Sequence, residues 1–289
     1  MSTTAPELMT PGKGRGLLDV FRNRYLLRLL VDKEIQVRYR GTVLGLVWSY
    51  LKPAVQFFVY YIAMGIFLEL EKGLENFAIY LFSGIVLMNL FGEIFGNASR
   101  SMTDNGGLLK KIYLPRQLFP VANLFVALVH FLPQLLILLI ACLAAGWHPG
   151  PKQFLCMIAG FFIVAIFALG LGLIFATLNV FFRDAENFVD LILMVSTWAS
   201  PVLYPFTMVE DKLPQWVYYI YFANPLTVAV ELFHYGFWFA SVELEQPRWH
   251  VADHLMTFWT PFALLVSVAA VLVGDRIFRR YEGNFAQEL

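Results

Sequence analysis

Residues 118–146 read LFPVANLFVALVHFLPQLLILLIACLAAG, a run without any Asp, Glu, Lys or Arg. A helix needs roughly 20 apolar residues to cross a bilayer, because each residue adds about 1.5 Å and the hydrocarbon core is about 30 Å thick. The run is therefore long enough to cross, and it predicts a membrane-spanning helix. Similar runs occur throughout the chain.

Composition leads to the same prediction. The 289-residue chain is 59% hydrophobic and 15% charged, and its mean hydropathy is +0.64. These values lie outside the usual composition of a soluble globular protein. The length accommodates about six spans with modest loops, so we expect one membrane domain. The formal net charge of +0 says little, because charge placement matters more in a membrane protein.

Seven runs are candidates for membrane-crossing helices because they carry few or no charges. They are Trp48–Leu68, Phe77–Ala98, Leu118–Gly146, Phe154–Phe182, Phe188–Phe206, Trp216–Ala240 and Leu255–Val273. The sixth run is interrupted by Asn224-Pro225 and carries Glu231 and His234. The break divides it into two pieces that are each too short to cross alone.

The placement of Lys and Arg predicts the orientation. If successive loops alternate between the two sides of the membrane, one side collects Lys13, Arg15, Arg22, Arg24, Arg28, Lys33, Arg38, Arg40, Arg100, Lys110, Lys111, Arg116 and Arg183. By the positive-inside rule that side, with the N-terminus, is cytoplasmic. The basic C-terminal tail is also cytoplasmic only if the sixth run enters and leaves by the same face.

We therefore predict an all-α integral membrane protein with six transmembrane helices. A re-entrant helical hairpin over 213–241 opens outward between spans five and six. Before the spans, residues 1–16 form a flexible cytoplasmic tail and residues 17–40 an amphipathic helix at the interface. The membrane domain covers 41–275, with a loop at 99–117, and residues 276–289 form a second cytoplasmic tail.

Four segments carry a resemblance to a known family. They are Arg38-Tyr39-Arg40-Gly41 with the following Leu44-Gly45, Trp48 and Pro53; Asn105–Arg116; Phe181-Phe182-Arg183-Asp184; and Asn224-Pro225 before Glu231. The chain resembles the membrane subunits of ABC exporters of polysaccharides, a family that includes O-antigen, capsule and teichoic-acid exporters. It departs from the family at His234, where an arginine is common.

The resemblance implies a homodimer in the bacterial inner membrane that exports a lipid-linked glycan. Two separate nucleotide-binding subunits would hydrolyse ATP with Mg²⁺, so this chain would be a permease and not an enzyme. The chain itself agrees with this division of labour. Gly12-Lys13-Gly14 lacks the spacing of a phosphate-binding loop, and no metal-ligand cluster or catalytic arrangement is evident. Cys142 and Cys156 lie in apolar runs and are expected to be small buried hydrophobes.

The loop between spans two and three is the expected contact with the ATPase subunit. In the family this loop forms a short coupling helix, and the resemblance assigns that role here to Asn105, Gly106, Leu108, Leu109, Lys110, Lys111, Ile112 and Tyr113, with Arg38 and Arg40 nearby. The apolar and basic residues suit a cleft in a partner protein. An alternative is a basic loop held at anionic lipid headgroups.

The expected substrate path is aromatic. Helical spacing joins Phe57, Tyr60, Tyr61 and Met64 on the first span, while Trp198 and Tyr204 belong to the fifth. Such rings can stack on many different sugars without binding any one of them strongly. The resemblance implies that spans one and five of two copies line the channel. The alternative is that these residues pack within the protein or face lipid.

Ionisable residues inside the membrane are few, and each is costly unless paired or solvated. Glu93 and Asp190 are expected to reach water or to pair with Arg100 or Arg183, and His130 to make one buried hydrogen bond. Glu231, with the Asn224-Pro225 break, is the candidate external gate. Two other functions stay open: an ABC exporter of drugs or small lipids, and a membrane-embedded glycosyl- or acyltransferase, which would need converging acids or histidines.

Overall fold

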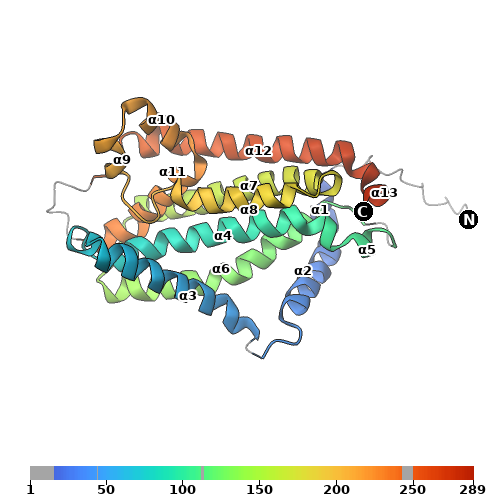
Figure 1. Ribbon diagram of the computed structural model, residues 1–289, viewed down its shortest axis with the longest axis horizontal. Coiled ribbons are helices and arrows are strands. Elements are labelled where there is room, and N and C mark those ends of the chain that lie inside the picture. Colours follow the sequence, from blue (N-terminus) through green and yellow to red (C-terminus); the bar gives the residue numbers. More distant parts are fainter. Residues whose placement is uncertain (1–15, 44, 112–113, 243–249) are drawn as a thin grey trace, which may run out of the picture.

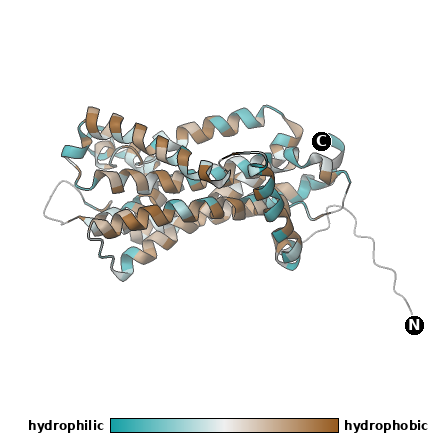
Figure 2. Ribbon diagram, turned by 90° about the horizontal axis from the view of Figure 1, so that it is seen from below, coloured by the Kyte–Doolittle hydropathy of each residue, from teal (hydrophilic) through white to brown (hydrophobic). Residues whose placement is uncertain are grey.

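The computed structural model describes residues 16–43, 45–111, 114–242 and 250–289, and within these ranges it contains helices and no strand. Long helices lie side by side along the long axis of the molecule (Figure 1). Hydrophobic residues colour most of their length brown, and hydrophilic residues gather mainly toward the ends (Figure 2). This distribution is the one expected for helices that cross a bilayer.

Five stretches of the described residues are long and apolar enough to cross a membrane. The main helices of these stretches are α3 (Trp48–Tyr60), which continues as the π-helix η2 (Tyr61–Phe67), α4 (Phe77–Asp104), α6 (Leu118–Ala144), α7 (Pro151–Phe181) and α12 (Thr260–Tyr281), which follows the π-helix η6 (Leu255–Trp259). Short 3-10 turns complete this part of the chain: η1 (Gly45–Val47) and η3 (Leu70–Lys72).

The run expected as span five differs from the prediction. Helix α8 covers Ala185–Trp198, only 14 residues, and the chain then turns until α9 (Thr207–Lys212). The cause is local. Pro201 has no backbone N–H and disfavours helical geometry in the residue before it, so the helix ends ahead of Ser200-Pro201.

The interrupted run is divided where the sequence indicates. Helix α10 (Gln215–Ala223) ends at Asn224 and α11 (Pro225–Phe233) begins directly afterwards. The Asn224 side chain accepts a hydrogen bond from the backbone N–H of Leu226 at 3.1 Å, and proline occupies the first position of α11. Both features are favourable helix starts. The chain continues as the π-helix η4 (His234–Trp238) and the turn η5 (Phe239–Ser241).

The region expected as one interfacial helix over 17–40 consists of two helices. Helix α1 (Leu17–Arg22) stops at Asn23, whose side-chain amide donates to the carbonyl of Asp19 at 2.8 Å, and α2 (Arg24–Tyr39) follows. Helix α2 packs against α6 and runs obliquely to the bundle at the end where α5 (Gly106–Leu109) and α13 (Phe285–Glu288) lie (Figure 1). The expected tail 1–16 lies outside the described residues except for Gly16.

The expected C-terminal tail is helical. Helix α12 extends to Tyr281, and the turn η7 (Glu282–Asn284) leads into α13. Phe285 is fully buried and contacts Phe278 edge-on, with ring centroids 5.1 Å apart. The end of the chain is therefore fastened to the same end of the bundle as α1 and α5.

Helix α7 is the central element, and it packs against α4 on one side and α12 on the other. Glycines allow the helices to approach closely. A Cβ added to Gly274 would lie 2.6 Å from the carbonyl oxygen of Gly170, and one added to Gly172 would lie 2.6 Å from the Cβ of Ala98. In lipid the hydrophobic effect does not drive helices together, so the close van der Waals packing that small residues allow stabilises these crossings.

Replacing Gly274 with alanine should weaken the α7–α12 contact. The added methyl group would meet backbone atoms, which cannot move aside without separating the helices, so we expect a loss of about 1–3 kcal/mol in the free energy of unfolding. The apparent Tm of the purified chain in detergent measures this loss. Gly283→Ala is the matched control, because a Cβ there has nothing within 4 Å. Equal Tm values for the two variants would contradict the packing argument.

Candidate functional site

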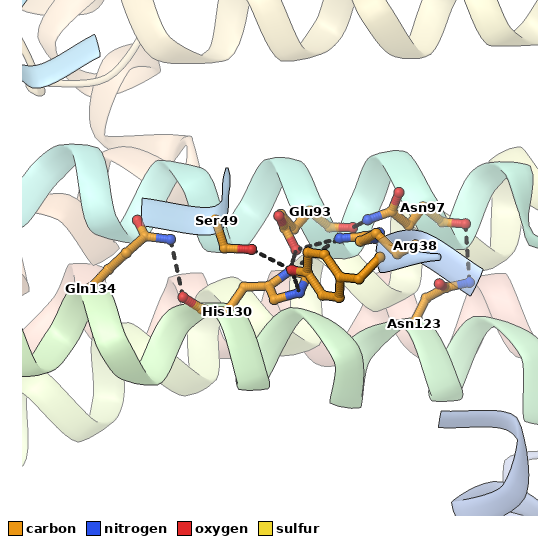
Figure 3. Close-up of polar contacts among 8 residues, drawn as sticks. Arg38, Ser49, Glu93, Asn97, Asn123, His130 and Gln134 are labelled. Atoms are coloured by element: carbon orange, nitrogen blue, oxygen red, sulfur yellow. Dashed lines mark hydrogen bonds and ion pairs between the residues drawn. The ribbon is translucent and has the colours of Figure 1, made fainter. Parts of the chain in front are cut away.

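A polar network joins the end of α2 to α4 and α6 (Figure 3). Arg38 Nη1 lies 3.3 Å from Glu93 Oε2, and His130 Nδ1 lies 2.6 Å from the same carboxylate oxygen. The Tyr39 hydroxyl is 2.7 Å from His130 Nε2 and also contacts the Ser49 hydroxyl at the start of α3. His130 is only 2% exposed.

Arg38 Nη1 also lies 3.0 Å from His130 Nδ1, so the guanidinium, the imidazole ring and the Glu93 carboxylate all contact one another. The cation of Arg38 lies beside the carboxylate, which lowers the cost of that charge within a spanning helix. The network ties α2, the start of α3, α4 and α6 together.

The sequence-based expectation for these residues needs correction. Glu93 pairs with Arg38 and His130 and not with Arg100 or Arg183, although its side chain stays 32% exposed as the alternative of reaching water requires. His130 makes more than one polar contact. The expected ion pair of Asp190 with Arg100 is confirmed, at 2.7 Å. Glu93 and His130 therefore converge, although in sequence they appear scattered. Their charges and hydrogen bonds are engaged with each other, with Arg38 and with Tyr39, which is an arrangement that holds helices together.

A polar cavity of about 370 Å³ adjoins the network. It lies between α3, α4, α6 and α8, and Glu93 is on its wall. Its lining residues are Trp48, Ser49, Lys52, Pro53, Gln56, Met88, Asn89, Phe91, Gly92, Glu93, Gln134, Leu193 and Thr197. Asn89 donates to the side chain of Gln134 at 3.1 Å, and Gln134 donates to the backbone of His130 at 3.1 Å.

The cavity is unusual because polar groups are expensive at membrane depth. Amides, hydroxyls, one ammonium group and the Glu93 carboxylate line a space large enough for a sugar unit, in the size range of small-molecule sites. Sequence reasoning missed Lys52, Gln56, Asn89 and Gln134. A signal was present, since Lys52 and Gln56 are four residues apart and so share a face of an otherwise apolar helix.

The six residues expected to line a channel fall into two groups. On the first span, Phe57 stacks on Tyr61 with centroids 5.7 Å apart and meets Phe82 of α4 edge-on, while Tyr60 and Met64 are half-buried beside them. The second group lies at the end of α8 and in the turn that follows it. None of the six lines the polar cavity. Phe57 instead borders an apolar cavity of about 270 Å³ between α3, α4 and α6.

The second group consists of Trp198, the last residue of α8, and Tyr204 in the turn that follows. Trp198 is 55% exposed, and the Tyr204 hydroxyl donates to its carbonyl at 2.6 Å. The buried Tyr80 of α4 donates to the carbonyls of Pro201 and Tyr204 at 2.8 and 3.0 Å. Thr227 of α11 donates to the carbonyl of Ala199 at 3.3 Å. Side chains from α4 and α11 thus hold the break at the end of α8.

The expected gate residues lie next to this break. Asn224 and Pro225 start α11, and Glu231 is 3% exposed with its Oε1 3.2 Å from His234 Nδ1. The ring of His234 stacks on Tyr80 with centroids 3.8 Å apart. Glu231 therefore connects to the turn after α8 through His234 and Tyr80.

Part of the expected coupling segment is buried against the rest of the chain. Asn105, Gly106 and Leu109 are buried, and Lys33 of α2 donates to the Asn105 side chain. Leu108 is half-buried, and Lys110 and Lys111 are exposed. Ile112 and Tyr113 lie outside the described residues. Of the two arginines grouped with this segment, Arg38 faces Glu93 and Arg40 is exposed.

The base of α8 is attached at the same end of the bundle. Arg100 near the end of α4 lies 2.6 Å from Glu186 and 2.7 Å from Asp190. Both carboxylates are at least half exposed. Exposed ion pairs of this kind contribute only about 0–1 kcal/mol each, so this end of α8 is held weakly.

Comparison with known proteins gives a consistent set of relatives. The O-antigen export system permease protein RfbA of Klebsiella pneumoniae is 28% identical over 91% of this chain and 95% of its own length. RfbA of Myxococcus xanthus is 30% identical over 67% of this chain and 74% of its own. The capsule polysaccharide export inner-membrane protein CtrC of Neisseria meningitidis serogroup A is 23% identical over 87% and 89%.

Residues 25–238 match the model of the family described as ABC-2 type transporter, a range that includes the Arg38–Glu93–His130 network, the polar cavity and the Asn224-Pro225 break. Members of this family are the permease subunits of ABC exporters and are not enzymes themselves. The chain belongs to the ABC-2 type transporter membrane family.

Proposed function

We propose that this chain is the transmembrane subunit of an ATP-driven exporter that moves a lipid-linked polysaccharide from the cytoplasm to the outer face of the bacterial inner membrane. The observation that carries the proposal is the similarity to O-antigen and capsule export permeases over most of the chain. The polar cavity supports it, because amide and hydroxyl side chains at membrane depth suit a substrate rich in hydroxyls.

The arrangement of the spans is part of the proposal. Helices α3, α4, α6, α7 and α12 make five crossings, α8 with the following turn makes another, and α10 with α11 forms the outward re-entrant hairpin. Charge placement supports a cytoplasmic location for both termini and for α5. Backbone that is broken at membrane depth must be surrounded by protein, and the side chains of Tyr80 and Thr227 at the break after α8 supply that surrounding.

A homodimer with two nucleotide-binding subunits, which hold ATP and Mg²⁺, completes the proposed exporter. Helix α3 supports the dimer, because only 6% of its spanning window is buried within one chain. Helix α8 also exposes large apolar side chains, namely Phe188, Leu191, Met194, Val195 and Trp198. Both helices border the polar cavity through Gln56 and Thr197, so a second copy placed against them would enclose a path for the substrate.

The Arg38–Glu93–His130 network gives the proposed exporter a route from the ATPase to the path. Helix α2 lies beside the coupling segment through the contact of Lys33 with Asn105. Further along the same helix, Arg38 contacts Glu93 of α4 and His130 of α6, and Tyr39 contacts the first turn of α3. A displacement of α2 would therefore reach the wall of the cavity directly.

The export function can be tested with the purified chain and its ATPase subunit in proteoliposomes. Lipid-linked glycan should stimulate ATP hydrolysis and should move across the membrane only when ATP is present. In cells, depletion of the chain should strand that glycan on the cytoplasmic side. The proposal fails if the complex transports drugs or short-chain lipids and ignores lipid-linked glycan, or if glycan is modified without the ATPase.

The cavity provides a second prediction. Gln56→Leu should reduce glycan-stimulated ATPase activity and transport at least tenfold, because it replaces a polar wall group by an apolar one, and a loss of about 1.4 kcal/mol gives that factor. Hydrolysis without glycan should stay unchanged. Val55→Leu is the matched control, since it alters the neighbouring exposed residue of the same helix, outside the cavity. Equal transport by both variants would remove the cavity from the path.

The network provides a third prediction. Glu93→Gln should leave ATP hydrolysis active but lower the glycan moved per ATP roughly tenfold, because the bond from α2 to α4 loses its charge while Arg38 keeps its own. Arg38→Met combined with Glu93→Met should restore part of the coupling by removing both charges. The exposed Glu69, paired with Lys72, is the control position, and Glu69→Gln should behave as wild type. Normal transport per ATP in Glu93→Gln would contradict the proposed route.

A further inference from the structure

A second polar cavity lies at the opposite end of the bundle from α5 and α13, where α9 and α10 meet the start of α12 (Figure 1). Its volume is about 460 Å³. The lining residues are Glu210, Leu213, Gln215, Tyr218, Tyr219, Asp253, His254, Phe258 and Trp259. They combine open aromatic rings with hydrogen-bonding groups.

The aromatic part of the wall is half open to solvent. Tyr219 is 52% exposed and Phe258 is 55% exposed. Both rings rest on the buried Trp259, with centroids 6.2 and 5.0 Å from its ring. The planes of Tyr219 and Phe258 make angles of 36° and 79° with that of Trp259, so the two rings form an apolar platform of two inclined surfaces. Because Trp259 supports both rings, a ligand can pack against them at low entropic cost.

The polar part of the wall includes Tyr218, whose hydroxyl lacks a hydrogen-bond partner among the described residues. Tyr218 is 9% exposed, and its hydroxyl is buried without a hydrogen-bond partner among the described residues. A buried hydroxyl without a partner costs about 1–3 kcal/mol, so such groups are rare unless a ligand or water completes them. Glu210 lies 3.3 Å from His250, and the exposed Gln215, Asp253 and His254 complete the polar set.

We propose that this cavity binds one or two uncharged sugar units. A pyranose ring presents C–H groups on its face and hydroxyls around its edge. Tyr219 would pack against the face and Phe258 against one side of the sugar ring, while Asp253, Gln215 and the Tyr218 hydroxyl would bond to the hydroxyls at its edge. The volume lies within the range of small-molecule sites.

The charge of the wall favours an uncharged sugar over a phospholipid headgroup. The wall carries the carboxylates Glu210 and Asp253, and the described residues that line it include neither Lys nor Arg. A phosphodiester would be repelled by those carboxylates. The inference rests on the proposed function for its biological meaning: in that orientation the cavity is on the outer face and receives the glycan as it leaves the path.

The test uses the whole complex of chain and ATPase subunit in nanodiscs. The probe is a set of neutral oligosaccharides released by mild acid from the surface glycan of cells that carry the chain, and binding is measured by saturation-transfer NMR and by titration. Tyr219→Ala should raise Kd about tenfold by removing half of the platform. Tyr218→Phe, which deletes only the hydroxyl, should raise Kd roughly threefold to tenfold.

Two controls lie on the same helices outside the cavity. Trp216→Ala removes an exposed aromatic side chain of α10, and Asp211→Asn removes an exposed charge of α9. Both should bind oligosaccharide as wild type does. If Tyr219→Ala and Tyr218→Phe also bind as wild type, or if phosphoethanolamine displaces the oligosaccharide, the proposed saccharide site is overturned.

Transport measured in parallel separates this inference from the proposed function. A wild-type complex that moves lipid-linked glycan in proteoliposomes but binds no oligosaccharide overturns the site and leaves the export function standing. A complex that binds oligosaccharide through Tyr218 and Tyr219 but moves no lipid-linked glycan supports the site and contradicts the export function.

Discussion

The contact of Arg38 and His130 with Glu93 is the interaction on which the arrangement of this membrane domain depends. A carboxylate in the second half of a spanning helix is costly unless its charge is neutralised, and here a residue from α2 supplies the cation. This requirement draws the end of α2 against α4 and α6. Because the chain turns into α3 only a few residues later, the same contact sets where the first span begins and where the polar cavity opens.

The remaining helices fall into a rigid and a loosely held set. Helices α4, α7 and α12 meet through glycines, so that backbone contacts backbone at Gly170 and Gly274. Helix α3 has few fully buried residues, and α8 is held by exposed ion pairs at its base and by hydrogen bonds to the carbonyls at its end. Several backbone contacts at close range outweigh surface ion pairs of about 0–1 kcal/mol each. Motion in the proposed exporter is thus expected in α3 and α8, around a fixed α7.

Sequence patterns predicted the all-helical membrane fold, the break at Asn224-Pro225 and the pair of Asp190 with Arg100, because each depends on local features: hydrophobic length, a proline, or charges at neighbouring helix ends. They did not predict the partner of Glu93, since Arg38 is 55 positions away and only the packing of α2 against α6 brings it close. The short α8 was missed for a different reason. Apolar residues continue from Phe188 to Phe206, and hydrophobicity alone does not report that the helix ends before Pro201. The polar cavity was missed because its polar side chains come from four helices, and most of them look like isolated exceptions in apolar runs.

The two polar cavities are connected by the least regular part of the chain. Thr197 of α8 lines the cavity beside Glu93, and two residues later the carbonyl of Ala199 accepts a hydrogen bond from Thr227 of α11. Helix α10, which ends directly before α11, carries Tyr218 and Tyr219 into the second cavity. If α8 shifts away from α4 together with the turn that follows it, the hydrogen bonds of that turn to Tyr80 and Thr227 would break. The same step would release α10 and α11. In the proposed exporter this sequence of contacts makes opening toward the outside depend on the movement of α8, because the turn at residues 199–206 cannot follow α8 while Tyr80 still holds two of its carbonyls.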